Sequence, residues 1–329
     1  MTGMRLLVTG GAGYVGSVTV ETLVGAGFEV LVIDDLRTGH RAAVHPAARF
    51  VRANVADEAA VRAALREHRC DALLHFAAAS LVGDSMRDPH GYFHNNVAGT
   101  LALLRAVAAE GIERVVFSST AALYGTPERT PIPETAPLAP ESVYGETKLQ
   151  IERALSWLAR TTGLASVALR YFNAAGASAE RGEDHRPESH LIPLVLEVAS
   201  GVRDVVQVFG DDYPTADGTA IRDYVHVLDL ADAHVRALEA LRSGEAKAFN
   251  LGNGAGASVA EVIATVREVT GCEVPTRLAP RRAGDPPVLV ADAGLAQREL
   301  GWQPLRPALA DIVADAWRWR QAHPRGYGA

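Results

Sequence analysis

Cysteine is scarce in this sequence of 329 residues, and long hydrophobic runs are missing from it. Its two cysteines, Cys70 and Cys272, form no Cys-x-x-Cys pair, so neither a zinc site nor a redox dithiol is expected. The apolar run near the start, Leu6–Val8, is too short for the core of a signal peptide. No apolar stretch approaches the roughly 20 residues that a membrane helix needs. We therefore expect a cytoplasmic protein without a metal.

Positive charge is also in short supply. The chain has 32 Lys and Arg residues against 39 Asp and Glu residues, which gives a net charge of −7. Proteins that bind nucleic acids or acidic membranes need a basic face, so neither partner is expected. A phosphorylated small molecule remains possible, because a pocket needs only local positive charge.

Strand-like and helix-like segments alternate through the first half of the chain, which predicts an α/β protein with a doubly wound parallel sheet covered by helices. The expected strands are continuously apolar, as strands buried on both faces are. They are 5–9, 29–33, 49–54, 72–77, 114–118 and 165–171, and the expected helices are 15–26, 57–67, 96–110 and 144–161.

The second half is less regular. Residues 177–189 and 210–219 are rich in polar residues and are expected to be loops, whereas Ser258–Glu261 is a capping box that opens a helix. A terminal amphipathic helix is expected over 307–323. We expect a nucleotide-binding domain over 1–175 and a smaller α/β substrate lobe over 176–329, with the segment 222–250 rejoining the first domain.

A glycine motif, G-x-x-G-x-x-G, places Gly10, Gly13 and Gly16 between the first strand and the first helix. Glycines at these positions allow a tight turn, the approach of a phosphate to the backbone, and close packing of helix and strand. The helix N-terminus then offers free N–H groups to a pyrophosphate. The motif predicts a dinucleotide site.

The identity of the dinucleotide depends on Asp34, which ends the second strand. A carboxylate there binds ribose hydroxyls and repels a 2′-phosphate, which favours NAD over NADP. Arg37, His40 and Arg41 follow closely and are the residues that could serve a phosphate instead. Asp35 is either a cofactor contact or a turn residue.

Tyr144 and Lys148 lie four residues apart on an expected helix, which places both side chains on one face. An ammonium group favours the phenolate, so Lys148 is expected to lower the pKa of Tyr144, and Tyr144 is the candidate general base. Thr120 follows the fifth strand, at the sheet edge where ligands bind, and is the candidate proton relay.

With these motifs, the sequence resembles the extended short-chain dehydrogenase/reductases, and within them the UDP-glucose (galactose) 4-epimerases. The resemblance covers nearly the whole chain and implies a Rossmann-type fold. The matching segments are 9–16, 34–36, 75–78, 82–85, 95–97, 118–125, 144–148, 169–173, 209–215, 217–219, 222–227 and 282–285.

The resemblance implies an NAD-dependent inversion at C4 of a UDP-hexose through a 4-keto intermediate, in a homodimer formed by helices 96–110 and 144–161. It implies the catalytic residues Tyr144, Lys148 and Thr120. The implied cofactor contacts are Gly10, Gly13, Tyr14, Val15, Gly16, Asp34, Asp35, Asn54, Val55, Phe76, Ala77, Ala78, Asn95, Ser118, Tyr144, Lys148 and Tyr171. The implied substrate contacts are Ser80, Thr120, Tyr144, Asn173, His190, Leu191, Phe209, Arg222, Tyr224, Arg282, Asp285 and Leu289.

Several positions depart from the family pattern. Asn54, Ser80 and His190 stand where some relatives have Asp, Lys and Asn. Leu289 occupies the position that limits room for an N-acetyl group, and its intermediate size leaves UDP-GlcNAc/UDP-GalNAc activity open, as well as activity on a UDP-pentose.

Two other functions are alternatives to epimerisation. A sugar-nucleotide 4,6-dehydratase carries Asp-Glu after the strand-end hydroxyl residue, where this chain has Ala121 and Ala122. A non-catalytic nucleotide sensor can lose the Tyr/Lys pair, which this chain keeps. Both alternatives are disfavoured.

Overall fold

The computed structural model describes residues 3–282 and 284–328. Its centre is a seven-stranded sheet in the order β11-β6-β5-β4-β1-β2-β3, and every neighbouring pair is parallel. The strands are β1 (Arg5–Thr9), β2 (Glu29–Asp34), β3 (Arg49–Arg52), β4 (Ala72–His75), β5 (Arg114–Thr120), β6 (Ala165–Tyr171) and β11 (Ala246–Leu251). Strands β1 to β6 lie in the order 3-2-1-4-5-6, which is the order of dinucleotide-binding folds. The predicted doubly wound sheet is therefore confirmed.

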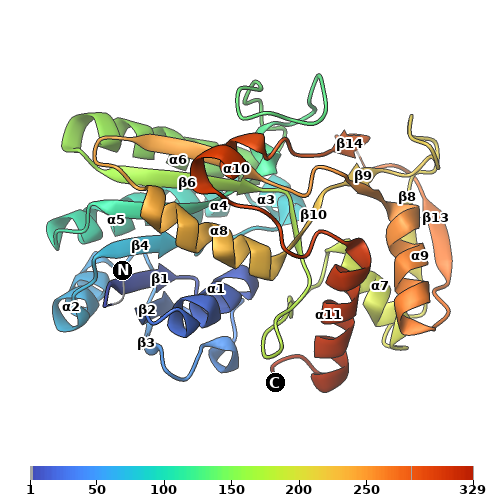
Figure 1. Cartoon of the computed structure of the whole chain (residues 1–329), viewed down its shortest axis with the longest axis horizontal. Coiled ribbons are helices and arrows are strands. Elements are labelled where there is room, and N and C mark those ends of the chain that lie inside the picture. Colours follow the sequence, from blue (N-terminus) through green and yellow to red (C-terminus); the bar gives the residue numbers. More distant parts are fainter. Residues whose placement is uncertain (1–2, 283, 329) are drawn as a thin grey trace.

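Helices cover both faces of this sheet (Figure 1). Because side chains alternate along a strand, neighbouring residues of β1 enter different cores: Leu6 and Val8 pack on one side, and Leu7 on the other. The first core is completed by α1 (Tyr14–Gly25), α8 (Val227–Ala240) and α10 (Gly294–Leu300). The second is completed by α2 (Glu58–His68), α5 (Gly99–Ala109) and α6 (Val143–Thr162).

The helix expected over 96–110 begins earlier than its apolar pattern indicates. Asp88 accepts a hydrogen bond from the Gly91 N–H and caps a turn that has Pro89 at its first position, an arrangement typical of helix starts. This turn is α4 (Pro89–Tyr92), and a π-helical segment, Phe93–Ala98, joins it to α5. Short helices precede and follow: α3 (Val82–Arg87) and the 3₁₀ turns Arg41–Ala43 and Ala121–Leu123.

A smaller α/β region lies at the carboxyl edge of the sheet, to the right in Figure 1. Its core includes Ile192, Val262 and Ile312, contributed by α7 (Leu191–Ala199), α9 (Val259–Thr270) and α11 (Leu309–Ala322). Its short strands pair as β7 (Asn173–Ala175) with β10 (Tyr224–His226), as β8 (Val206–Phe209) with β13 (Thr276–Ala279), and as β9 (Ile221–Arg222) with both β12 (Ala257–Ser258) and β14 (Val288–Leu289).

The chain passes between the two regions more than once. After contributing β10 to the smaller region, it returns through α8, which packs against α1, and through β11, which pairs with β6 in the large sheet. It returns again as α10, which contacts α8 and β11. No helix among residues 3–282 and 284–328 combines the length and the apolar character that crossing a bilayer demands.

Candidate active site

The glycine motif forms the turn between β1 and α1. Gly10 has a positive φ of +75°, and a Cβ atom there would lie 2.5 Å from the backbone nitrogen of Ala77. A Cβ on Gly16 would lie 2.2 Å from the carbonyl oxygen of Gly10. The protein itself therefore requires both of these glycines. A Cβ on Gly13 would meet only the Gly10 oxygen, at 3.4 Å, an ordinary contact. The fold itself therefore does not require glycine at position 13. The missing side chain leaves open space beside the loop.

Asp34 supports this loop from the end of β2. Its carboxylate accepts hydrogen bonds from the backbone N–H groups of Ala12 (3.0 Å) and Leu36 (2.9 Å). Burial raises the pKa of Asp34, and these two hydrogen bonds oppose the rise. The carboxyl group lies beside the glycine loop, as a residue that binds the adenosine ribose must.

The basic residues that could have served a 2′-phosphate are engaged elsewhere. Arg37 pairs with Asp35 at 2.7 Å and also donates to Asn95. His40 bonds the carbonyl oxygen of Asp184 at 2.8 Å, and Arg41 lies over the ring of Phe50. Asn54 donates to Asp35 as well, at 2.9 Å. This arrangement favours NAD over NADP.

The segment after β4 lies against the glycine loop, because the N–H groups of Phe76 and Ala77 both donate to the carbonyl oxygen of Thr9. Asn96 fixes Ala79, two residues further on: its side chain accepts from the Ala79 N–H and donates to the Ala79 carbonyl, at 2.8 and 2.9 Å. Sequence reasoning missed Asn96 and named its neighbour Asn95 instead. The structure was needed to show which of the two asparagines faces the segment after β4.

Other residues that were expected to contact the cofactor or the substrate lie on several different elements. The Tyr14 hydroxyl donates to the carbonyl oxygen of Gly176 at 2.6 Å, and Val15 follows it in the first turn of α1. Val55 packs against the core beneath α2 and α5. Ala78 is half-buried, whereas Ser80 is exposed.

The Tyr/Lys pair lies on α6, beside the end of β5. The Lys148 ammonium donates to the carbonyl oxygen of Ser118 at 2.8 Å and lies 5.9 Å from the centre of the Tyr144 ring. The backbone N–H of Tyr144 donates to the Ser85 hydroxyl at 3.1 Å, a contact that sequence reasoning missed. The hydroxyl groups of Ser118 and Tyr171 are hydrogen-bonded to each other. The predicted pair therefore shares one helix face.

Burial controls the protonation of both residues in the protein alone. It raises the pKa of Tyr144 to about 12, and a hydrogen bond with the Thr120 side chain opposes the rise. It lowers the pKa of Lys148 to about 7, against the attraction of Glu152. The expectation that Lys148 makes the phenol acidic is wrong for this state. The reason is that desolvation disfavours the charged form of each group and is the largest cause of both shifts.

Several of the expected substrate residues gather in the smaller region. Arg222 forms an ion pair with Asp285, and the Arg282 guanidinium lies 4.1 Å from the ring centre of Phe209. The N–H of Asp285 donates to the carbonyl oxygen of Arg282 at 3.3 Å; Ala283, inside this motif, lies outside the described residues. Leu289 pairs with Arg222 between β14 and β9. This places a cation, a carboxylate and an apolar side chain together.

Two further residues connect this region to the sheet. The backbone N–H of Asn173 donates to the carbonyl oxygen of Asp223 at 2.9 Å, and Tyr224 is buried. The Asp223 carboxylate accepts from the N–H groups of Asn253, Gly254 and Ala291. Sequence reasoning missed this carboxylate, because its three partners are distant in the chain.

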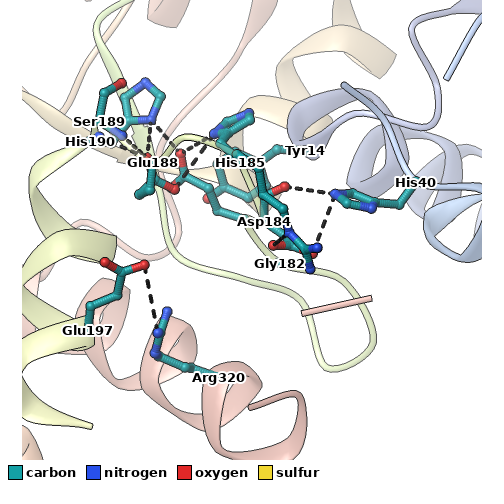
Figure 2. A network of polar contacts seen from close by, with 12 residues as sticks. Tyr14, His40, Gly182, Asp184, His185, Glu188, Ser189, His190, Glu197 and Arg320 are labelled. Carbon is teal, nitrogen blue, oxygen red and sulfur yellow. Dashed lines mark hydrogen bonds and ion pairs between the residues drawn. The ribbon is translucent and has the colours of Figure 1, made fainter. Parts of the chain in front are cut away.

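His190 has partners that the sequence did not suggest (Figure 2). Its Nδ1 lies 2.7 Å from a carboxylate oxygen of Glu183 and 3.0 Å from one of Glu188. The glutamates raise the pKa of His190 well above its ordinary value. Leu191, the next residue, begins α7. His190 is thus anchored to its own loop through Nδ1.

Comparison with known proteins agrees with this geometry. Residues 6–252 match the NAD dependent epimerase/dehydratase family. A UDP-glucose 4-epimerase of Streptomyces lividans is 52% identical, with 98% of each chain covered, and one of Lacticaseibacillus casei is 48% identical, with 99% of each covered. The structure of a UDP-glucose 4-epimerase from Stenotrophomonas maltophila, with bound NAD and formylated UDP-arabinopyranose, superposes with a TM-score of 0.94 at 45% identity. It covers 98% of this chain and 99% of that one.

The cofactor is therefore NAD, and the room beside Gly13 together with the adjacent Asp34 carboxylate fits it. The sequence, the sheet order and the full-length relatives agree: this chain belongs to the NAD-dependent epimerase/dehydratase family, among its UDP-glucose 4-epimerases.

Proposed function

We propose that this enzyme interconverts UDP-glucose and UDP-galactose by inverting C4 of the hexose. The observation that carries the proposal is the position of Tyr144 and Lys148 on one face of α6, beside the end of β5 in the NAD-binding half of the chain. The full-length relatives named as UDP-glucose 4-epimerases support it.

Tyr144 removes the proton of the C4 hydroxyl, and the Thr120 hydroxyl hydrogen-bonds the reacting oxygen and relays the proton. Bound NAD⁺ would accept the C4 hydride and, once reduced, would give it back to the opposite face of C4, and its positive charge would favour the phenolate that burial alone disfavours. A 4-keto sugar results. The hexose then turns about its bond to the diphosphate and presents its other face, and Tyr144 returns the proton as the inverted alcohol forms.

Lys148 has two roles in this proposal. Its ammonium is held by the Ser118 carbonyl oxygen, close to the phenol. A lysine in this position binds ribose hydroxyls of the dinucleotide and stabilises the phenolate once the crevice is filled. The remaining NAD contacts are those expected above, with Asp34 at the ribose and Gly13 at the pyrophosphate.

The UDP group is bound by the smaller region. Arg222 and Arg282 each carry a planar guanidinium that can bind phosphate oxygens in a bidentate manner. Asp285, which pairs with Arg222, accepts hydrogen bonds from ribose hydroxyls. Firm binding of UDP and loose binding of the hexose allow the sugar to turn between the two half-reactions.

A coupled assay for UDP-glucose from UDP-galactose, together with release of the bound nucleotide from denatured protein, tests the proposal. Turnover with NAD recovered from the protein supports it. Bound NAD with no turnover of any sugar nucleotide would favour a sensor instead. Parallel kinetics on UDP-GalNAc and on UDP-xylose show whether Leu289 admits other sugars.

We also propose that the NAD-binding domain comprises residues 1–175 with the segment 222–250, and that the rest of 176–329 binds the UDP-sugar. The return of α8 and β11 to the large sheet supports this division. Hydrogen exchange tests it: NAD should protect amides of the first part, and UDP those of the second.

A homodimer formed by α5 and α6 is a further proposal. A groove between these helices is lined by Leu101, Leu104, Ile151 and Ala154, and Leu101 and Trp157 are 43% and 64% exposed. Packing against the same helices of a second copy would cover them, as in an isologous interface. Light scattering should give twice the mass of one chain for the wild type and a monomer for Leu101→Glu.

We also propose a cytoplasmic location. The two free cysteines are consistent with a reducing compartment, and cell fractionation tests this location.

A further inference from the structure

The segment between β7 and α7 brings together four side chains that can bind a metal ion. Their spacing is Glu-x-His-x-x-Glu-x-His, and each offers one ligand atom; His185, Glu188 and His190 are labelled in Figure 2. All four atoms lie within 4.8 Å of one another, and they belong to Glu183, His185, Glu188 and His190.

The distances suit a small divalent ion. An oxygen of Glu183 lies 3.0 Å from Nδ1 of His185 and 2.7 Å from Nδ1 of His190. Oxygens of Glu188 lie 3.8 and 3.0 Å from the same two nitrogens. Metal bonds of about 2.0–2.2 Å in a tetrahedron separate the ligand atoms by roughly 3.3–3.5 Å. The four Glu–His separations lie on both sides of that range, and all ligand atoms lie within 4.8 Å of one another, so side-chain movements would bring them to coordination distances.

A divalent ion would also balance the charge of the two glutamates. The side chains of both glutamates are only 7% exposed. Among the described residues, the ion pairs of Glu183 and Glu188 involve His185 and His190, and no Lys or Arg. Two carboxylates withdrawn from water are costly unless they are paired or bind a metal. One divalent ion with two neutral imidazoles neutralises them completely.

We propose that Glu183, His185, Glu188 and His190 form a binding site for a divalent transition-metal ion of the Zn²⁺ type. Two imidazole nitrogens and two carboxylate oxygens are ligands that Zn²⁺ accepts. An ion can enter from solvent, because the His190 side chain is 44% exposed and that of His185 is 26% exposed.

The site would join two parts of the protein that lie far apart in the sequence. The His185 ring packs edge-on against Tyr14, with ring centres 6.3 Å apart, and Tyr14 opens α1 directly after the glycine loop. His190 immediately precedes α7. The ion therefore fixes the 183–190 segment between the dinucleotide loop and the smaller region. This role is structural and does not depend on which sugar nucleotide is the substrate.

Calorimetric titration of the chelator-treated, tag-free full chain with ZnCl₂ tests the site. The wild type should bind one equivalent, and its melting temperature should rise. The double variant His185→Gln/Glu188→Gln should lose at least about 100-fold in affinity. The matched control is His68→Gln/Glu67→Gln, which removes a His–Glu pair far from the site in the sequence and should bind Zn²⁺ as the wild type does.

X-ray absorption of the zinc-loaded wild type reads the ligand set without any substitution, so a double variant that fails to fold does not block the test. Two imidazole nitrogens and two oxygens around zinc support the site. The proposal is overturned if the wild type binds no Zn²⁺ at micromolar concentrations, if the double variant binds as tightly as the control, or if the spectrum shows another ligand set. In those cases the histidines act only as protonated partners of the glutamates.

Discussion

The Lys148 ammonium donates a hydrogen bond to the Ser118 carbonyl oxygen at 2.8 Å, in an interior where Lys148 is 2% exposed. One backbone carbonyl is a poor substitute for the water that an ammonium loses on burial. The pKa of Lys148 is accordingly lowered to about 7.

This shift makes the stability of the NAD-free protein depend on pH. Between about pH 7 and pH 10 the unfolded chain keeps a proton on Lys148 that the folded chain has lost, so the free energy of unfolding rises with pH by about 1 kcal/mol per unit. Urea unfolding at pH 7, 8 and 9 should show this rise in the wild type but not in Lys148→Met. Equal slopes in both proteins would show that Lys148 is not the titrating group.

Replacing Tyr144 with Phe removes the proposed base while keeping the ring. Turnover of UDP-galactose should fall by about 10²–10⁴-fold, whereas UDP binding, measured by calorimetry, should stay within a factor of about two of the wild type. Tyr92→Phe is the matched control, because its hydroxyl donates to the Leu81 carbonyl and has no proposed chemical role. Activity retained in Tyr144→Phe would assign the base elsewhere.

The glycine loop allows the role of Gly13 to be separated from folding. A methyl group on Gly13 meets only one ordinary contact in the protein, so Gly13→Ala should leave the melting temperature of the NAD-free protein nearly unchanged while sharply reducing the NAD that copurifies. Gly16→Ala clashes with the Gly10 carbonyl and should destabilise the fold itself.

Gly25→Ala is the control for this pair, since nothing lies within 4 Å of the added methyl and alanine is the better helix former. It should keep its NAD. The assignment of the phosphate site to Gly13 fails if Gly13→Ala retains a full equivalent of NAD.

A buried ion pair lies behind the active site. Arg170 and Glu152 pair at 2.5 Å, with side chains 7% and 9% exposed, and Glu152 also accepts from the Ser119 hydroxyl at 2.5 Å. Glu152→Ala leaves a buried guanidinium without its carboxylate and should cost about 3–5 kcal/mol in the free energy of unfolding. Urea unfolding measures this loss. The exposed pair Arg87–Asp84 provides the comparison, since Asp84→Ala should change stability by less than about 1 kcal/mol.

The sequence predicted those parts of the site that depend on local spacing. The glycines of the first turn and the Tyr144/Lys148 pair are each a few residues apart on one element, so their spacing alone fixes their relative placement. It did not predict Asn96 against Ala79, nor the three N–H groups around Asp223, because these contacts depend on where loops run after they leave the sheet. It also gave the wrong sign for the pKa of Tyr144, because burial cannot be read from the spacing of two residues.

Because the chain passes between the two regions more than once, the gene segments that encode them cannot be exchanged at a single junction. A single genetic junction placed after β7 would carry α8, β11 and α10 away together with the sugar-side elements. The seventh strand and two of the helices over the large sheet would then come from a foreign parent. Exchange of the sugar-binding part alone requires several coordinated junctions, so a new specificity is reached more readily by point substitutions on the existing loops.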